Sequence, residues 1–356
     1  MKVYYIGNRY EGCYYVRCLL PLIYNGWDGQ KTSIYGKQAD NNTLFKGAMA
    51  ADTIVFQRPS DPAKVYAIDL LKLAGKKIVF DNDDTYKANA GVPTQMLNYK
   101  DEVKLNNINT NLNFAIEKSD LVTTTTEFLA EEYRKLNKNV MVLPNLIDPE
   151  DWNEPVHNET DKVRIGMVGS VLTNLEYEHI QDTLKKLSDR DDVQLVILGL
   201  PKGAKKGSVL ADADKEELKF WKEFKNIEWH EWVQHSEYNS LLNELRLDIM
   251  LIPRHDSYFN RCKSNVKFLE ASMCEVPVIA QGFKDKKSPY EVNTEDTKYC
   301  KIVTDNSQWS EVIDDLIEHP KKREQMGKDA REYVIANYNI KNKFMLWENA
   351  YKTMFE

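Results

Sequence analysis

The chain has 356 residues, of which 42% are hydrophobic and 29% charged, and its formal net charge is −7. This length predicts two domains, each with its own core, and the composition is that of a soluble globular protein. No stretch approaches the ~18 apolar residues of a membrane-spanning helix, and the negative charge argues against a surface built to bind nucleic acid.

In the first 150 residues, short β-branched or aromatic runs alternate with helical patterns, such as those at 14–25 and 126–136. Strands are predicted at 2–6, 52–56, 76–81, 120–124 and 139–143. Such alternation is typical of crossover units with helices on both faces of a parallel sheet. We therefore expect residues 1–150 to form an N-terminal Rossmann-like domain.

A second strand series follows the polar, proline-bearing stretch 144–162, which is predicted to be a linker. Its members are VRIGMVGS, VQLVILG, NIEWHEW, LDIMLIP, VPVIAQ and CKIVT. Residues 160–335 should thus form a second Rossmann-like domain, and the α/β fold should have two facing domains with a deep interdomain cleft. Phe344, Trp347 and Tyr351 predict that residues 336–356 form a helix with one apolar face, crossing back to the first domain.

The five cysteines and the N-terminus indicate a reducing compartment. Cys13, Cys18, Cys262, Cys274 and Cys300 form no CxxC pair, and an odd number cannot all pair within the chain. MKVYYIGNRYEG lacks the apolar core and cleavage site of a secretory signal. We expect reduced cysteines, an apolar rather than reactive role for Cys262, and a cytoplasmic protein.

The stretch 247–281 reads strand, loop, helix, strand and has an unusual charge layout. Ser264 or Asn265 can cap the helix, and Lys263 and Lys267 then lie near one face together with Glu270. Like charges four residues apart, or a cation near a helix N-terminus, cost roughly 0.2–1 kcal/mol, and a bound anion would reverse both penalties.

A diphosphate is the anion that this helix end is predicted to bind. It would accept hydrogen bonds from the backbone N–H groups of 264–267, which include Val266, and from Lys263 and Lys267. Arg254 or Arg261 would lie close by in the loop. The alternative is that both lysines are simply solvated.

Two sets of carboxylates are further candidates. Glu270 has apolar neighbours, so we expect it to be partly buried and to accept hydrogen bonds from ribose hydroxyls, unless it forms an internal salt bridge. Asp81, Asp83 and Asp84 end the third strand, where neighbouring acids suggest acceptor orientation, general-base work or metal binding. Solvated strand-end caps are the alternative for these three.

Residues 163–281 resemble the donor-binding domain of glycosyltransferase family four (group 1), which contains retaining enzymes of the GT-B fold. CKSNVKFLEASMCEVPVIA aligns without a gap with the family's Glu-x7-Glu run, and Glu270 matches the second Glu, which in the family binds ribose. Cys262 replaces the first Glu, which contacts the sugar, and GSVLTNLEYEH lacks the usual Arg/Lys pair. These departures resemble a subgroup with the pattern FNxxKSxxKxLE, in which the two lysines, here Lys263 and Lys267, would bind the phosphates.

Other segments are similar to the same family: GCYYVRCLLP, SDLVTTTTEFLAEEY and VLPNLID. The resemblance implies that Gly12 allows close backbone approach, that Asn145 lies at the hinge side of the cleft, and that Gly169 and Ser170 lie beneath the diphosphate. It also implies that the first domain is the acceptor side.

The function implied is transfer of a hexosyl or pentosyl group from a nucleotide diphosphate sugar to an acceptor hydroxyl, with retention and without a metal or a further cofactor. Lys263, Lys267 and Asp84 are the expected catalytic residues. A non-catalytic protein that binds nucleotide sugars or a partner, and a nucleotide-sugar epimerase, stay open as alternatives. The acceptor is undetermined among a glycan, a cell-wall polymer, a protein, a small molecule and a modified nucleobase.

Overall fold

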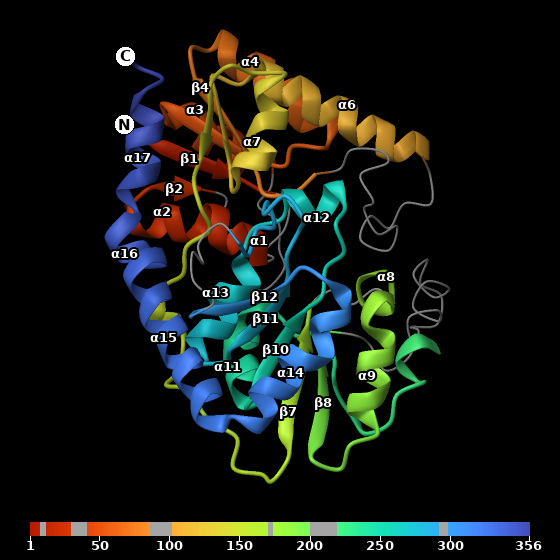
Figure 1. Ribbon diagram of the computed structural model, residues 1–356. Helices are drawn as coiled ribbons and strands as arrows, with labels where there is room; N and C mark the ends of the chain where they lie inside the picture. Colours follow the sequence, from red (N-terminus) through yellow and green to blue (C-terminus); the bar gives the residue numbers. More distant parts are fainter. Residues whose placement is uncertain (8–11, 30–40, 86–101, 170–173, 200–218, 292–297) are drawn as a thin grey trace.

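The computed structural model describes residues 1–7, 12–29, 41–85, 102–169, 174–199, 219–291 and 298–356. It contains two six-stranded parallel sheets, one above the other in Figure 1. The first sheet with its helices α1 to α7 is called the first domain here, and the second sheet with helices α8 to α15 the second domain. Parallel sheets with helices on both faces confirm the predicted α/β class.

The first sheet has the strand order β2-β1-β3-β4-β5-β6. Its strands are β1 (Val3–Ile6), β2 (Asp28–Gly29), β3 (Thr53–Gln57), β4 (Lys77–Asn82), β5 (Leu121–Thr124) and β6 (Val140–Val142). Its helices are α1 (Gly12–Tyr14), a π-helical turn (Tyr15–Leu19), α2 (Leu20–Tyr24), α3 (Asn41–Ala50), α4 (Pro62–Leu73), α6 (Glu102–Lys118) and α7 (Glu127–Arg134). All five predicted strands are present, and only the two-residue β2 was not predicted.

The second sheet has the strand order β12-β11-β10-β7-β8-β9. Its strands are β7 (Val163–Val168), β8 (Val193–Leu198), β9 (Ile227–His230), β10 (Ile249–Ile252), β11 (Val278–Gln281) and β12 (Cys300–Val303). Its helices are α8 (Asn174–Tyr177), α9 (Gln181–Ser188), α11 (His235–Glu244), α12 (Tyr258–Cys262), α13 (Val266–Met273), α14 (Trp309–Glu318) and α15 (Pro320–Tyr338). Short 3₁₀ turns lie at Pro149–Asp151, Glu178–Ile180 and Asn306–Gln308.

Both faces of each sheet are apolar, because helices cover both. In β3, Ile54 and Phe56 join an apolar cluster beneath α3, α4, α6 and α7, whereas Val55 joins the cluster on the other face. In β7, Met167 and Val168 likewise belong to different clusters. This explains why the strands read as continuous apolar runs rather than alternating ones.

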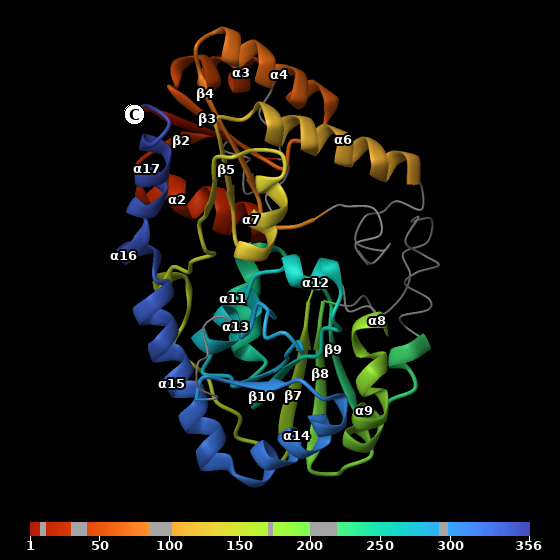
Figure 2. The same cartoon turned by 45° about the horizontal axis from the view of Figure 1, so that its top comes forward.

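Helix α15 runs along one side of the second domain, and α16 (Ile340–Lys343) and α17 (Met345–Lys352) continue along the same side of the first domain, as Figures 1 and 2 show. The backbone of Ile147 bonds to that of Tyr338 and Ile340 at 2.9 and 2.8 Å. Tyr351 in α17 is fully buried and its hydroxyl is 2.9 Å from that of Tyr5 in β1. The C-terminal segment therefore packs on the first domain.

Among the described residues, no helix combines the length and the apolarity that spanning a membrane requires.

Candidate functional site at the interdomain junction

The carboxyl ends of the strands of both sheets point toward the other domain, and we call this region the interdomain junction. On the first-domain side of the junction lies the fully buried ion pair of Arg17 and Asp81, with nitrogen–oxygen distances of 2.6 and 3.1 Å. Arg17 also donates to the carbonyl oxygen of Leu143 and, at 3.3 Å, to Oδ1 of Asn145. Burial alone would lower the pKa of Arg17, but Asp81 raises it, so the guanidinium stays charged.

Asp83 and Asp84 follow β4 and share Arg58, which follows β3. Arg58 donates two hydrogen bonds to Asp83 and lies 3.6 Å from Asp84. Burial tends to raise the pKa of Asp83, but the Arg58 guanidinium outweighs it and lowers that pKa to about 2. Arg58 has φ of 48°, in the left-handed region that a bulky side chain rarely adopts. The three predicted acids are therefore buried and paired, not solvated strand caps.

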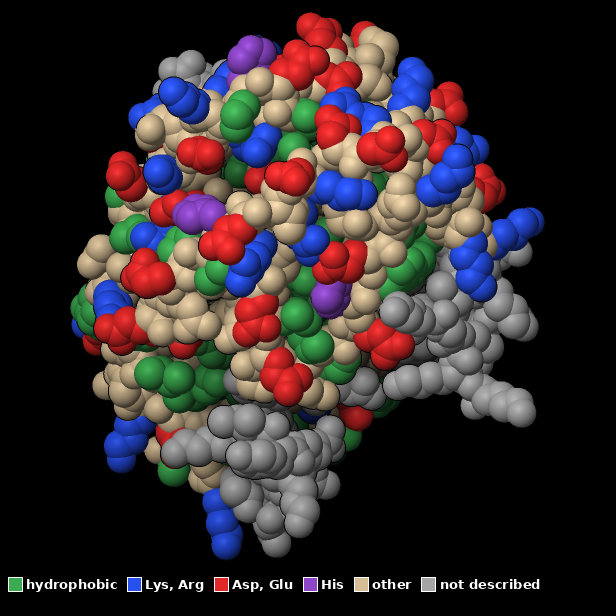
Figure 3. All heavy atoms as spheres, turned by 90° about the horizontal axis from the view of Figure 1, so that it is seen from below, with side chains coloured by type: hydrophobic (Ala, Val, Ile, Leu, Met, Phe, Trp, Pro, Cys, Tyr) green, Lys and Arg blue, Asp and Glu red, His purple; other side chains and the backbone are tan. Residues whose placement is uncertain are grey.

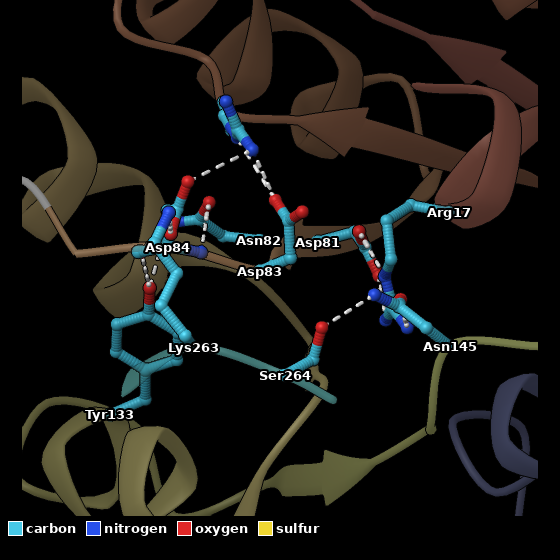
Figure 4. Close-up of polar contacts among 10 residues, drawn as sticks. Arg17, Asp81, Asn82, Asp83, Asp84, Tyr133, Asn145, Lys263 and Ser264 are labelled. Carbon is cyan, nitrogen blue, oxygen red and sulfur yellow. Dashed lines mark hydrogen bonds and ion pairs between the residues drawn. The ribbon is translucent and has the colours of Figure 1, made fainter. Parts of the chain in front are cut away.

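Figure 4 shows two of the polar contacts by which described residues cross the interdomain junction. Nζ of Lys263 lies 2.6 Å from Oδ1 of Asp84, and both side chains are largely buried. Nδ2 of Asn145 donates to Oγ of Ser264 at 2.9 Å. Lys263 and Ser264 precede α13, so the structure brings together four predicted residues from the two domains.

Helix α13 begins at Val266 with Asn265 at the N-cap position, one of the two predicted cap residues. The expected helical spacing of Lys263 with Lys267 does not hold, because Lys263 precedes the helix. Lys263 ends the short helix α12 in an extended conformation, with ψ of 155°. Asn265 occupies the N-cap position, but its side chain makes no capping bond and instead donates to the hydroxyl of Tyr338 at 3.2 Å.

Lys267 and Glu270 form a compact group with Tyr238 of α11. The three contacts are 2.7 Å for Lys267 Nζ to Glu270 Oε2, 2.8 Å for Lys267 Nζ to the Tyr238 hydroxyl, and 2.7 Å for that hydroxyl to Glu270 Oε2. Glu270 is thus partly buried, as predicted, and it does have the internal salt bridge named as the alternative. In a nucleotide complex, a phosphate group could accept hydrogen bonds from Lys267 and ribose hydroxyls could donate to Glu270. These two interactions would replace the ion pair between Lys267 and Glu270.

Gly12 approaches the second domain beside this group. An ideal Cβ built on Gly12 would lie 3.8 Å from Nδ1 of His235, the first residue of α11. The rings of Tyr15 and His235 are 4.3 Å apart between centroids. Burial lowers the pKa of His235, although Glu270 nearby acts in the opposite direction, so the neutral ring is favoured.

Arg254 belongs to a buried polar cluster in the second domain. Its Nη1 donates to Oδ1 of Asn260 at 3.3 Å, and Nδ2 of Asn260 donates to both carboxylate oxygens of Glu176, each at 3.1 Å. Nδ1 of His255 lies 3.5 Å from Glu176. The nearby Glu176 carboxylate raises the pKa of His255, although burial acts in the opposite direction. Burial tends to raise the pKa of Glu176, but His255 and Arg254 lower it, so the carboxylate is the favoured form.

One of the predicted donor residues, Gly169, lies at the end of β7. Gly169 is at the carboxyl end of this strand, where its N–H donates to the carbonyl oxygen of Leu198 at 3.0 Å. Ser170 lies outside the described residues. Val266 is the first residue of α13. The N–H groups of Phe268 and Leu269 donate to the carbonyl oxygen of the N-cap Asn265, whereas those of Val266 and Lys267 precede the first hydrogen bonds of the helix.

The sequence analysis assigned no role to Arg58, Glu176, His235, Tyr238 or Asn260. Arg58 directly follows a predicted strand and could have been found by its position at the carboxyl edge. Asn260 is the Asn of the FNxxKSxxKxLE pattern, so the motif includes it, but no role could be assigned to it from the sequence. Glu176 and Tyr238 lie far from the motif in sequence, and only folding brings them to it.

The opposite end of the second domain has a different character. A cavity of about 360 Å³ there is lined by residues that include His157, Asp248, Glu275 and Arg323. These pair among themselves, as in Arg323 with Asp248 at 3.2 Å and His157 with Glu275 at 3.4 Å. In Figure 3, which views the molecule from this end, acidic and basic side chains are interspersed.

In the described part of the chain, no group of three or more His, Cys, Asp or Glu side chains could hold a metal ion.

Residues 178–349, just under half of the chain, match a family described as "Glycosyl transferase-like". The matched segment contains Arg254, Lys263, Lys267 and Glu270, but not Glu176 or any residue of the first sheet. No curated protein sequence matches the chain.

Several solved structures share the whole fold. The Anabaena protein HepE in complex with UDP and glucose has a TM-score of 0.70 and 11% identity, and the match covers 99% of this chain and 100% of that one. Sucrose-phosphate synthase from Thermosynechococcus elongatus has a TM-score of 0.66 and 13% identity, with coverage of 100% and 99%. A glycosyltransferase from Rickettsia africae has a TM-score of 0.63 and 11% identity, with coverage of 99% and 98%.

At such low identities these similarities establish the fold alone. The fold is that of GT-B glycosyltransferases, with two Rossmann-like domains. The family match adds that the C-terminal half is glycosyltransferase-like in sequence.

Proposed function

We propose that the protein is a metal-independent glycosyltransferase that moves a sugar from a nucleotide diphosphate sugar to an acceptor hydroxyl with retention. The observation that carries this proposal is the ion pair across the junction between Lys263, next to α13, and Asp84 of the first domain. Asp84 also acts electrostatically on Arg254, and Lys267 pairs with Glu270 on α13 itself. The glycosyl transferase-like match of 178–349 and the UDP bound by the similar HepE structure support it.

The donor would bind by exchanging partners within the second domain. Glu270 accepts from Lys267 and Tyr238 in the structure, and ribose hydroxyls can replace these donors. Lys267 is then available to the diphosphate, together with Lys263 and the first-turn N–H groups of α13. These cations supply the positive charge that a divalent metal ion provides in other phosphate sites.

Catalysis would follow from the growth of negative charge on the leaving group. As the bond between the sugar and the diphosphate breaks, Lys263, Lys267 and Arg254 stabilise the departing oxygen. The acceptor hydroxyl attacks from the same face of the sugar and its proton passes to the departing phosphate, which gives retention without a protein nucleophile. Asp84 loses Lys263 to the diphosphate and can then accept a hydrogen bond from the acceptor.

The test is release of nucleoside diphosphate from a panel of UDP-, GDP-, dTDP- and CDP-sugars, with and without EDTA. We expect slow release from one donor that EDTA does not change. Lys263→Ala should lower kcat by about 100-fold or more, because one preorganised donor is lost. Glu270→Ala should raise KM for the donor about tenfold. Lys328→Ala, an exposed lysine of α15, is the matched control and should leave both constants unchanged.

Other outcomes would separate the alternatives. Conversion of the donor sugar to its epimer without release of diphosphate would identify an epimerase. A donor that raises the melting temperature but is never cleaved, with any acceptor, would identify a non-catalytic binding protein. Release that EDTA abolishes would refute metal independence.

A further inference from the structure

Two residues of α12 make contacts that the proposed function does not use. Phe259 and Asn260 are the first two fixed letters of the FNxxKSxxKxLE pattern, and they lie just before Lys263. Their side chains are 2% and 0% exposed. A bound substrate therefore has no surface of these residues to touch, and any role in the reaction must act through their neighbours.

Through one amide group, Asn260 of α12 contacts α8 and the loop after β10. Its Nδ2 donates to both oxygens of Glu176 at 3.1 Å and to the carbonyl oxygen of His255 at 2.9 Å. Its Oδ1 accepts from Nη1 of Arg254 at 3.3 Å. Only an amide offers donors on one side and an acceptor on the other, so neither Asp nor Leu of similar size can make this set.

Phe259 acts on the other cation. Nζ of Lys263 lies 4.2 Å from the centroid of the Phe259 ring, within cation–π distance. The same ammonium is 2.6 Å from Asp84. The ring therefore restricts the position of the Lys263 ammonium group when its ion pair with Asp84 is broken.

Helix α12 is itself fixed to both domains. Oγ of Ser257 caps it by accepting from the backbone N–H of Asn260 at 3.1 Å. Cys262, fully buried, belongs to the apolar cluster of the first domain, and the Tyr258 ring is 5.5 Å from that of Phe128 in α7. A segment of five residues is too short to be stable alone, so these contacts define its position.

We propose that Asn260 and Phe259 are positioning residues that set Arg254 and Lys263 against the donor diphosphate, so that this five-residue helix acts as the template for the cationic part of the site. The inference rests on the proposed function. It assigns to α12 the task of holding two cations from different segments at a fixed separation, which the sequence alone left unexplained.

The first test is Asn260→Asp, with UDP as the probe in calorimetric titrations at pH 8 and pH 5.5. The introduced carboxylate would face Glu176 and the carbonyl oxygen of His255 at pH 8 and repel both, so we expect UDP affinity to fall at least about tenfold. At pH 5.5 the two carboxylates can share a proton, which restores a donor, and most of the affinity should return.

Other titratable and charged groups surround this position. Arg254, His255 and Asp256 come from the loop after β10. The side chains of Tyr177, His179 and Tyr290 also interact electrostatically with members of the cluster. Asp84 acts on Arg254 from the first domain. These groups also titrate in the native protein. The UDP affinity of the variant is therefore divided by that of the native protein at the same pH, and the two ratios are compared.

Asn243→Asp is the matched control. Asn243 in α11 is also buried, at 3% exposure, but it bonds to the backbone of Glu154 and Val156 instead of to the cations. We expect it to lower the melting temperature without changing UDP affinity. If Asn260→Asp behaves like this control, or if its loss of affinity is the same at both pH values, the positioning role is wrong.

A second variant tests Phe259. Phe259→Leu keeps the site apolar and should weaken UDP binding about two- to tenfold, because only the contact with Lys263 is lost. Phe224→Leu, buried in the core of the second domain, should leave UDP affinity unchanged. If the native protein itself binds no UDP and cleaves none of the donors in the panel, the proposed function fails and this inference with it. Native binding that both α12 variants retain refutes only the inference.

Discussion

Carboxylates at the end of a parallel strand can be predicted to face a ligand-binding edge, and Asp81, Asp83 and Asp84 do lie there. Their partners could not be predicted. Arg17 comes from the π-helical turn after β1, Arg58 from the end of β3 and Lys263 from the other domain. Each ion pair therefore forms only when these distant segments pack together in the folded chain. The same holds for Glu270, whose partial burial follows from its neighbours in sequence but whose contact with Tyr238 does not.

The Asp83–Arg58 pair gives a prediction for the pH dependence of stability. The folded-state pKa of Asp83 is about 2, below the ~3.9 of an unfolded chain, so its contribution is complete above pH ~4 and is lost as the pH falls toward 2. The contribution is about 2 kcal/mol. We expect the unfolding free energy of Asp83→Asn, from urea titrations between pH 5 and 3, to fall less steeply than that of the native protein.

The control for this experiment is Asp69→Asn, a more exposed carboxylate of α4 whose ion pair with Lys118 spans 3.9 Å. Exposed pairs contribute little, so its pH profile should parallel that of the native protein. Parallel profiles for Asp83→Asn and the native protein would contradict the assignment of a strongly bound carboxylate at this position.

At the scale of elements, the strands were easier to predict than the helices around the site. Runs such as KKIVFD are continuous and apolar because helices cover both faces of the sheet, and this signal needs no knowledge of partners. Helix α12 has only five residues, less than two turns, so periodicity could not reveal it. Because α12 was not predicted, the extended conformation of Lys263 between α12 and α13 was not predicted either.

The close packing of α15 on the segment after α13 gives a second prediction. An ideal Cβ on Gly327 would lie 1.9 Å from the carbonyl oxygen of Glu275, and backbone atoms cannot move aside as a side chain can. Gly327→Ala should therefore lower the unfolding free energy by about 1–3 kcal/mol, even though alanine favours a helix. Urea unfolding would measure this. Lys328→Ala on the exposed side of the same helix should not destabilise the protein, and a neutral Gly327→Ala would show that the two segments do not pack this closely.

At the scale of the molecule, the C-terminal segment packs against residues from the N-terminal part of the chain. Trp347 is fully buried and lies over the guanidinium of Arg17, 6.0 Å from ring centroid to Cζ, while Tyr351 stacks on Trp27 at 5.4 Å. The apolar spacing of these residues predicted a one-faced helix. Arg17 in turn pairs with Asp81 at the interdomain junction, so α17 packs behind the first-domain side of the candidate site.

This arrangement predicts that Trp347→Ala acts on the first domain. Truncation of a buried Trp costs about 3–5 kcal/mol. Trp347 lies over Arg17 of the first domain, in an apolar cluster that joins residues of β1 and α2 to residues of the second sheet. In differential scanning calorimetry we expect the unfolding of the first domain to move to lower temperature and to separate from that of the second, whose sheet keeps its own cluster around Trp221 and Trp309. Met345→Ala, at an exposed position of the same helix, should leave the trace unchanged. If Trp347→Ala lowers both transitions equally, the second domain depends on α17 as much as the first does, and the segment joins the two domains into one cooperative unit rather than completing the first.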